Sequence, residues 1–121
     1  MEISFDLNND FTEILEYDFG QGPVPAHQHQ RGGGWVANTA SVDDTCFIGE
    51  YAQVYGNARV MGHCIINDYA KVYGNATITN AARVYGDAEV YDNAQVGGNT
   101  RVSGFSKVYQ NAIIRDNAQV Y

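Results

Sequence analysis

The chain is short of basic residues, of histidine and of long apolar runs, and each shortage argues against a class of function. It has 7 Lys and Arg against 14 Asp and Glu, a formal net charge of −7. Because contacts from basic side chains to phosphate supply most nucleic-acid affinity, we expect no nucleic-acid partner. No apolar run approaches the ~20 residues of a membrane-spanning helix, so we expect no membrane partner either.

The acidic charge is concentrated in the N-terminal segment. Residues 1–34 have six acidic side chains and one Arg, and the sequence opens with MEISFDLNND. This opening lacks the basic stretch with which a secretory signal peptide begins. We therefore expect a cytoplasmic protein, or a virion-associated one if it is phage-encoded.

A repeat of six residues runs without a break from Val36 to Val120. Two residues before each β-branched member except the first stands a small side chain: ten Ala, two Cys, one Thr and one Ser. Residues two apart on a strand point to the same side, so both repeat positions face inward. The pair that follows is mostly Gly, Asn or Asp, which permits a corner. The fifteen members are Val36, Val42, Ile48, Val54, Val60, Ile66, Val72, Ile78, Val84, Val90, Val96, Val102, Val108, Ile114 and Val120.

A second period shows how many strands complete one coil. Similar segments recur every eighteen residues: QVYGNA (53–58), KVYGNA (71–76), EVYDNA (89–94) and KVYQNA (107–112). Eighteen residues make three hexads, so each coil has three sides. The sequence therefore predicts an all-β fold over 35–121, a triangular parallel β-solenoid of about five coils.

The small-x-Val/Ile hexad resembles the hexapeptide-repeat family of left-handed parallel β-helix proteins. The GGGWV entry (32–36) followed by YGNA repeats is similar to bacterial and phage proteins of unknown function, some of them labelled acetyltransferases by analogy. The resemblance implies a left-handed coil and a trimer of prisms packed side by side. It says little about activity, because one fold hosts many functions.

Residues 1–34 are expected to form an acidic cap or arm and a linker, because solenoid ends need covering. Residues 3–7 alternate like a strand. A short amphipathic helix, with Asn9 or Asp10 as its N-cap, is predicted from the spacing of Phe11, Ile14, Leu15 and Phe19.

One outward column of the prism is predicted to be aromatic. It contains four tyrosines, with Trp35 at its start: Tyr55, Tyr73, Tyr91 and Tyr109. Tyrosine is enriched at protein interfaces, so this column is our candidate interface. Two alternatives are that stacked rings reinforce the rungs and that they form a platform for a ligand.

Two enzymatic alternatives depend on the three histidines. Hexapeptide acyltransferases use a His as general base and hold acyl-CoA between prisms, which would make His63 the catalytic residue and acetyl-CoA the cofactor. The chain has no projecting loop of the kind such enzymes often carry. A carbonic-anhydrase-like zinc enzyme would need three or four ligands, for which His27 and His29 are weak candidates.

Cys46 and Cys64 lie eighteen residues apart at inward positions. We expect them on adjacent rungs as buried free thiols, because the rung spacing is wider than a disulfide prefers.

The preferred interpretation is a structural or interaction module without enzymatic activity and without a cofactor. We expect a homo-oligomer, as a trimer, or a partner protein that covers the C-terminal rung around Val120. The larger assembly is predicted to be a phage particle or a host complex.

Overall fold

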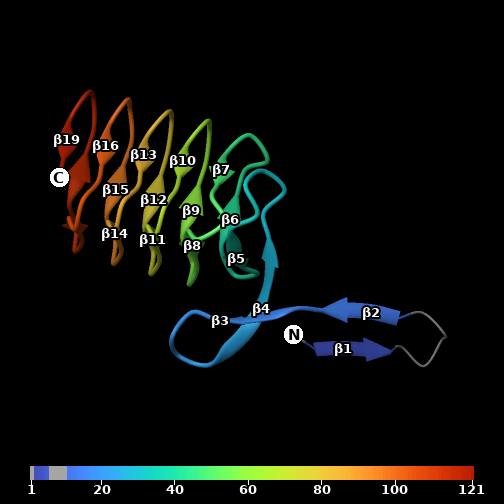
Figure 1. Ribbon diagram of the computed structural model, residues 1–121. Coiled ribbons are helices and arrows are strands. Elements are labelled where there is room, and N and C mark those ends of the chain that lie inside the picture. Colours follow the sequence, from blue (N-terminus) through green and yellow to red (C-terminus); the bar gives the residue numbers. More distant parts are fainter. Residues whose placement is uncertain (1, 6–10) are drawn as a thin grey trace.

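The hexads form fifteen short parallel strands, β5 to β19, that are stacked in coils of three (Figure 1). This computed structural model describes residues 2–5 and 11–121. The first of these strands is β5 (Trp35–Ala37). The others are β6 (Ser41–Val42), β7 (Phe47–Ile48), β8 (Gln53–Val54), β9 (Arg59–Val60), β10 (Ile65–Ile66), β11 (Lys71–Val72), β12 (Thr77–Ile78), β13 (Arg83–Val84), β14 (Glu89–Val90), β15 (Gln95–Val96), β16 (Arg101–Val102), β17 (Lys107–Val108), β18 (Ile113–Ile114) and β19 (Gln119–Val120).

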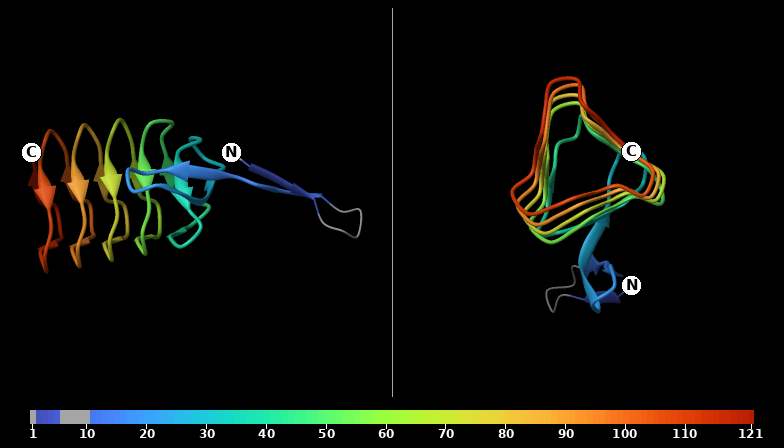
Figure 2. Two further views of the ribbon diagram at one scale, coloured as in Figure 1. Left: turned by 90° about the horizontal axis from the view of Figure 1, so that it is seen from below. Right: turned by 90° about the vertical axis from the view of Figure 1, so that its left-hand side faces the viewer.

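Three parallel sheets make the three flat sides of a prism, and the end-on view in Figure 2 shows their triangular outline. One face, which we call the tyrosine face because it carries the predicted tyrosine column, contains β5, β8, β11, β14 and β17. The second face contains β6, β9, β12, β15 and β18, and the third face contains β7, β10, β13, β16 and β19. Neighbouring strands pair in the eighteen-residue register, as in Val54 with Val72. The predicted period, coil number and three-sided form are confirmed.

The rungs are joined by backbone hydrogen bonds and closed around an apolar core. The N–H of Tyr55, for example, donates to the carbonyl of Val72 at 2.9 Å. Val54, Val72 and Val90 are 0 % exposed, as are the small residues Ala58 and Ala76. The small and β-branched positions therefore both face inward, as the alternation predicts.

The corners require residues that tolerate positive φ. Gly56 and Gly74 have φ of 65° and 66°. A Cβ on Gly56 would lie 2.9 Å from the backbone nitrogen of Gly74, so the stacked corner leaves no room for a side chain. Glycine therefore suits these corners by both conformation and close approach, and the same column continues with Asp92 and Gln110, which also have positive φ.

The N-terminal segment is made of strands. β1 (Glu2–Phe5) pairs antiparallel with β2 (Phe11–Ile14), and β3 (Glu16–Asp18) pairs antiparallel with β4 (Pro23–Gln28). The predicted amphipathic helix is therefore wrong. The proposed caps Asn9 and Asp10, like the end of the predicted first strand, lie outside the described residues.

The same segment covers two edges of the first coil. β4 pairs antiparallel with β5 and so extends the tyrosine face, which becomes a seven-stranded sheet. On the third face, the N–H of Gly34 donates to the carbonyl of Ile48 and the N–H of Ile48 donates to the carbonyl of Arg31, both at 2.9 Å. These bonds satisfy edge groups that an open solenoid end leaves unpaired. None of the described residues forms a helix that is long and apolar enough to cross a membrane.

Candidate interaction surface

The predicted tyrosines form one continuous ring stack on the tyrosine face. Ring centroids are 4.8 Å apart for Tyr55–Tyr73, 5.0 Å for Tyr73–Tyr91 and 5.5 Å for Tyr91–Tyr109. The first two pairs are within 4° of parallel. The eighteen-residue register puts each ring directly over the next, because every rung repeats the same backbone position.

Trp35 does not belong to this column, contrary to its predicted place. It pairs with Gln53 in the sheet and so heads the neighbouring outward column. Its ring stacks on Tyr17 of β3, with centroids 4.8 Å apart. Phe19, which follows β3, takes the place at the head of the tyrosine stack, 4.8 Å from Tyr55. The β3–β4 hairpin is therefore fixed to the face by two aromatic contacts.

Except at Tyr109, which has one ring neighbour, the stack presents ring edges to solvent, because the ring faces cover one another. Tyr55 lies between Phe19 and Tyr73, and Tyr73 lies between Tyr55 and Tyr91. A ligand platform needs a free ring face, so the geometry does not favour that alternative for these rings. The two other interpretations, reinforcement of the rungs and a protein interface, are compatible with exposed edges.

Burial and one carboxylate raise the pKa of two of the stacked phenols. Burial, and secondarily the charge of Glu89, raises the pKa of Tyr55 to about 12. Tyr73 donates a hydrogen bond to Glu89 Oε1 at 2.7 Å. Burial and this bond raise the pKa of Tyr73 as well. The hydroxyl groups of Tyr55 and Tyr73 are therefore neutral throughout the physiological pH range.

A groove of about 760 Å³ lies beside the stack, between the hairpin and the corner that follows the tyrosine face. It contains no charged side chain among its lining residues, which are Phe19, Gly20, Gln21, Gly22, Val24, Pro25, Ala37, Asn38, Thr39, Tyr55, Gly56, Tyr73 and Gly74. No sequence pattern indicates this groove, because the contacts that form it join residues distant in the chain. The alternation of Tyr17 and Phe19 puts both rings on one side of a strand, which indicates an aromatic side for the hairpin but not the groove itself.

A second aromatic feature stands at the opposite edge of the same face. Tyr51 and Tyr69 lie where the chain enters β8 and β11, and they are 60 % and 61 % exposed. Their rings stack on each other at 5.5 Å. We call this pair the edge tyrosine pair.

The histidines do not come together. His27 is exposed and its Nδ1 lies 2.7 Å from Asn38 Oδ1, beside the groove. His29 is buried, and its Nε2 donates to the carbonyl of Cys46 at 2.8 Å. Among the residues that the structure describes, no three His, Cys, Asp or Glu side chains gather in a way that could hold a metal. The two weak zinc candidates thus have separate hydrogen-bonding partners.

His63 is exposed at the corner between the second and third faces. In a three-sided prism this corner lies opposite the tyrosine face. The carboxylate that comes close to this corner, Asp43, accepts a hydrogen bond from the N–H of Gly62 at 3.0 Å. His63 is therefore remote from both the stack and the groove.

Cys46 and Cys64 are buried free thiols, as predicted. The Sγ of Cys64 lies 3.0 Å from the carbonyl oxygen of Met61, and that of Cys46 lies 3.4 Å from the carbonyl oxygen of Gly62. Burial raises the pKa of Cys46, and burial together with the neighbouring Cys46 raises that of Cys64 to about 12. Neither sulfur is suited to nucleophilic chemistry, which needs an exposed thiolate.

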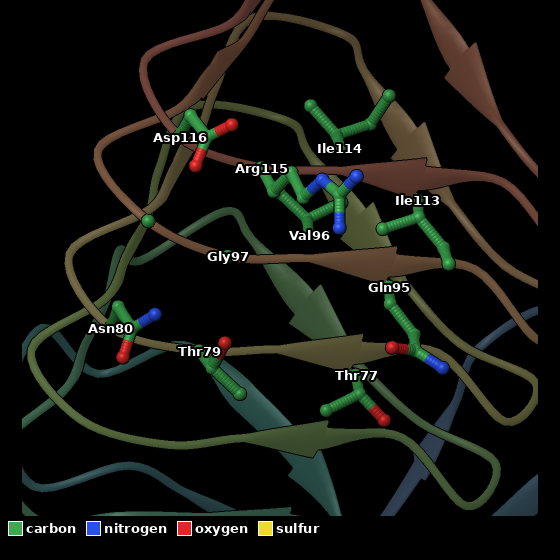
Figure 3. A pocket seen from close by; sticks show the side chains of 11 residues that line it. Thr77, Thr79, Asn80, Gln95, Val96, Gly97, Ile113, Ile114, Arg115 and Asp116 are labelled. Carbon is green, nitrogen blue, oxygen red and sulfur yellow. The ribbon is translucent and has the colours of Figure 1, made fainter.

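The second face has a shallow hollow of about 410 Å³ (Figure 3). It forms at Gly97, whose neighbours on the adjacent rungs, Thr79 and Arg115, both have side chains. Threonine, amide and guanidinium groups surround apolar Ile113 there. No aromatic stack accompanies this hollow, so the second face has no counterpart of the tyrosine column.

Comparison with known proteins finds two families of repeat. A family model described as bacterial transferase hexapeptide (six repeats) matches residues 45–80. A second, described as YdcK beta solenoid repeat, matches residues 82–98. No curated protein and no solved structure gives a match.

Proposed function

Since this chain is a hexapeptide-repeat β-solenoid protein, we propose that it works as a rigid interaction module that assembles into a homotrimer through its tyrosine face. The observation that carries this proposal is the unbroken ring stack from Phe19 to Tyr109. It turns one side of the prism into a stiff aromatic surface whose edges and hydroxyls point outward. Such amphipathic rings lose little conformational entropy on binding and are enriched at interfaces.

The rest of the prism supports a role in binding rather than catalysis. Each coil repeats the last without a projecting loop, so the outer surface consists of flat faces and tight corners (Figure 2). The histidines have separate surroundings, and the cysteines are buried with raised pKa values. Attachment to a phage particle stays a prediction from the sequence.

Light scattering coupled to size-exclusion chromatography tests the proposal. We expect a molar mass three times the chain mass of 13.3 kDa, unchanged over a wide range of concentration. A mass of one chain at the highest concentration would contradict it. Tyr91→Ser, which cuts the stack in its middle, should lower the mass or make it depend on concentration.

Acyl transfer is the second candidate, and the matched transferase hexapeptide family favours it. In that case His63 would be the general base, which requires that it face a cleft able to hold acetyl-CoA. Calorimetry with acetyl-CoA separates the two functions. Micromolar binding together with acyl transfer that is lost in His63→Ala would establish the enzyme, whereas no heat of binding favours the interaction module.

A further inference from the structure

We propose that the edge tyrosine pair of one chain, Tyr51 with Tyr69, inserts into the groove between the hairpin and the tyrosine face of the next chain. This inference rests on the trimer of the proposed function and assigns its contact surfaces. The occupant of the groove is thus a second copy of this protein.

The first argument is position around the prism. The edge tyrosine pair lies where the chain enters β8 and β11. The groove lies where the chain leaves these two strands, at Gly56 and Gly74. The two features therefore stand at opposite edges of one face. When three prisms turn that face toward a common axis, the entering edge of each meets the leaving edge of its neighbour. Such a head-to-tail contact closes into a ring.

The second argument is height along the prism. In a solenoid, height follows residue number, and a ring whose axis is parallel to the prism keeps all copies level. Tyr51 and Tyr69 stand two residues before β8 and β11, while the groove residues Tyr55 and Tyr73 directly follow the same two strands. The protruding rings and the groove therefore occupy the same level.

The third argument is charge and polarity. Each chain has a formal net charge of −7, so copies repel one another except where uncharged surfaces meet. The groove is lined without a charged residue and is mostly apolar, with Val24 39 % exposed. Tyr51 and Tyr69 carry no formal charge, stack on each other and are more than half exposed. An acidic residue directly precedes each of them, Glu50 and Asp68. Asp68 is turned toward its own chain, where it accepts a hydrogen bond from the N–H of Gly86 at 3.0 Å.

This arrangement also separates the two candidate functions. With the tyrosine face toward the axis, the corner that carries His63 lies on the outside of the ring. His63 would then be far from every cleft between subunits, where the transferase alternative needs it.

Two sets of variants test the contact. The double variant Tyr51→Ser/Tyr69→Ser should fall to the mass of a single chain in light scattering, while its circular dichroism stays that of a β-solenoid. Met61→Ser, which removes an exposed apolar side chain from the second face, is the matched control and should leave the mass unchanged. Val24→Glu attacks the contact from the groove side and should also dissociate it.

Cross-linking then fixes the direction of the contact. In the double variant Thr39→Cys/Tyr69→Cys, mild oxidation should give covalent trimers on a non-reducing gel, and each single variant should give none. Two results would overturn the assigned surfaces and leave the proposed function standing. The first is that Tyr51→Ser/Tyr69→Ser remains a trimer. The second is that Tyr69→Cys alone gives cross-linked dimers. A wild-type chain that is a single copy in solution would overturn both.

Discussion

The tyrosine face and the second face are made from the same hexad, yet their outer surfaces differ in kind. Inward, both place a small residue and a β-branched residue that are almost completely buried, such as Ala76 with Ile78 and Ala70 with Val72. Outward, the tyrosine face repeats one ring on four rungs, while the second face shows Met61, Thr79, Gly97 and Arg115 at the equivalent positions. The second face shows that a coil forms without an outward ring stack. The stack therefore adds to the shared repeat, through the stability that it gives to the rungs and through the binding that we propose.

The largest effect is expected for an inward residue. Ile78→Ala should lower the free energy of unfolding by about 2–5 kcal/mol, because it leaves a cavity in a fully buried layer. Its outward neighbour provides the control: Thr77→Ala should change stability by less than ~0.5 kcal/mol. Urea denaturation followed by circular dichroism measures both. Equal losses of stability in the two variants would contradict the assignment of Ile78 to the core and of Thr77 to the outer side of the strand.

A smaller loss of stability is expected for an outward residue, and it should differ between the tyrosine face and the second face. Tyr73→Ala removes two ring contacts and the hydrogen bond to Glu89, and should cost about 2 kcal/mol. Thr79→Ala, at the equivalent outward position of the second face, should cost less than ~0.5 kcal/mol. The same denaturation experiment applies. If both cost the same small amount, the tyrosine stack contributes nothing to the rungs, and its only role would be in contacts between molecules.

The ionisation of the stack gives a pH dependence. The folded protein raises the pKa of Tyr55 to about 12 from an ordinary value of 10.0. The stabilising contribution is therefore complete below pH 10 and is lost as the pH rises toward 12. Absorbance of tyrosinate at alkaline pH should show Tyr55 and Tyr73 ionising only above the ordinary value of 10.0. Ionisation of both residues near pH 10 would contradict the burial of the stack.

The fourth and smallest effect concerns the corner opposite the tyrosine face. Cys46 and Cys64 should not react with a thiol reagent at pH 8, because both are buried and burial raises their pKa values. Two thiols per chain should react once the protein is unfolded in guanidinium chloride. Rapid reaction of either thiol in the native protein would show that the coil opens at this corner.

Sequence reasoning identified the solenoid because its determinants are local. A small residue and a β-branched residue two positions apart, followed by a corner pair, specify each rung without reference to distant parts of the chain. All fifteen repeat positions, from Val36 to Val120, lie in strands. The two inward cysteines were placed correctly for the same reason.

The surface was only partly predictable, because its features depend on contacts between distant residues. The spacing of Phe11, Ile14, Leu15 and Phe19 suits a helix, but strands form there. Tyr17 and Phe19 then dock on Trp35 and Tyr55. Trp35 was assigned to the wrong column because it precedes its inward valine, whereas each tyrosine follows one. The groove arises from the docked hairpin, so no local pattern could indicate it.

Hydroxyl-radical footprinting with mass spectrometry tests most directly whether the tyrosine face is the contact surface. We predict that Tyr51, Tyr69 and Tyr73 are protected in the wild-type trimer and become reactive in the dissociated Val24→Glu variant. Met61 on the second face should be oxidised equally in both states. Protection of Met61 with unchanged reactivity of the tyrosines would contradict the account, because it would place the contacts on the face that lacks the stack.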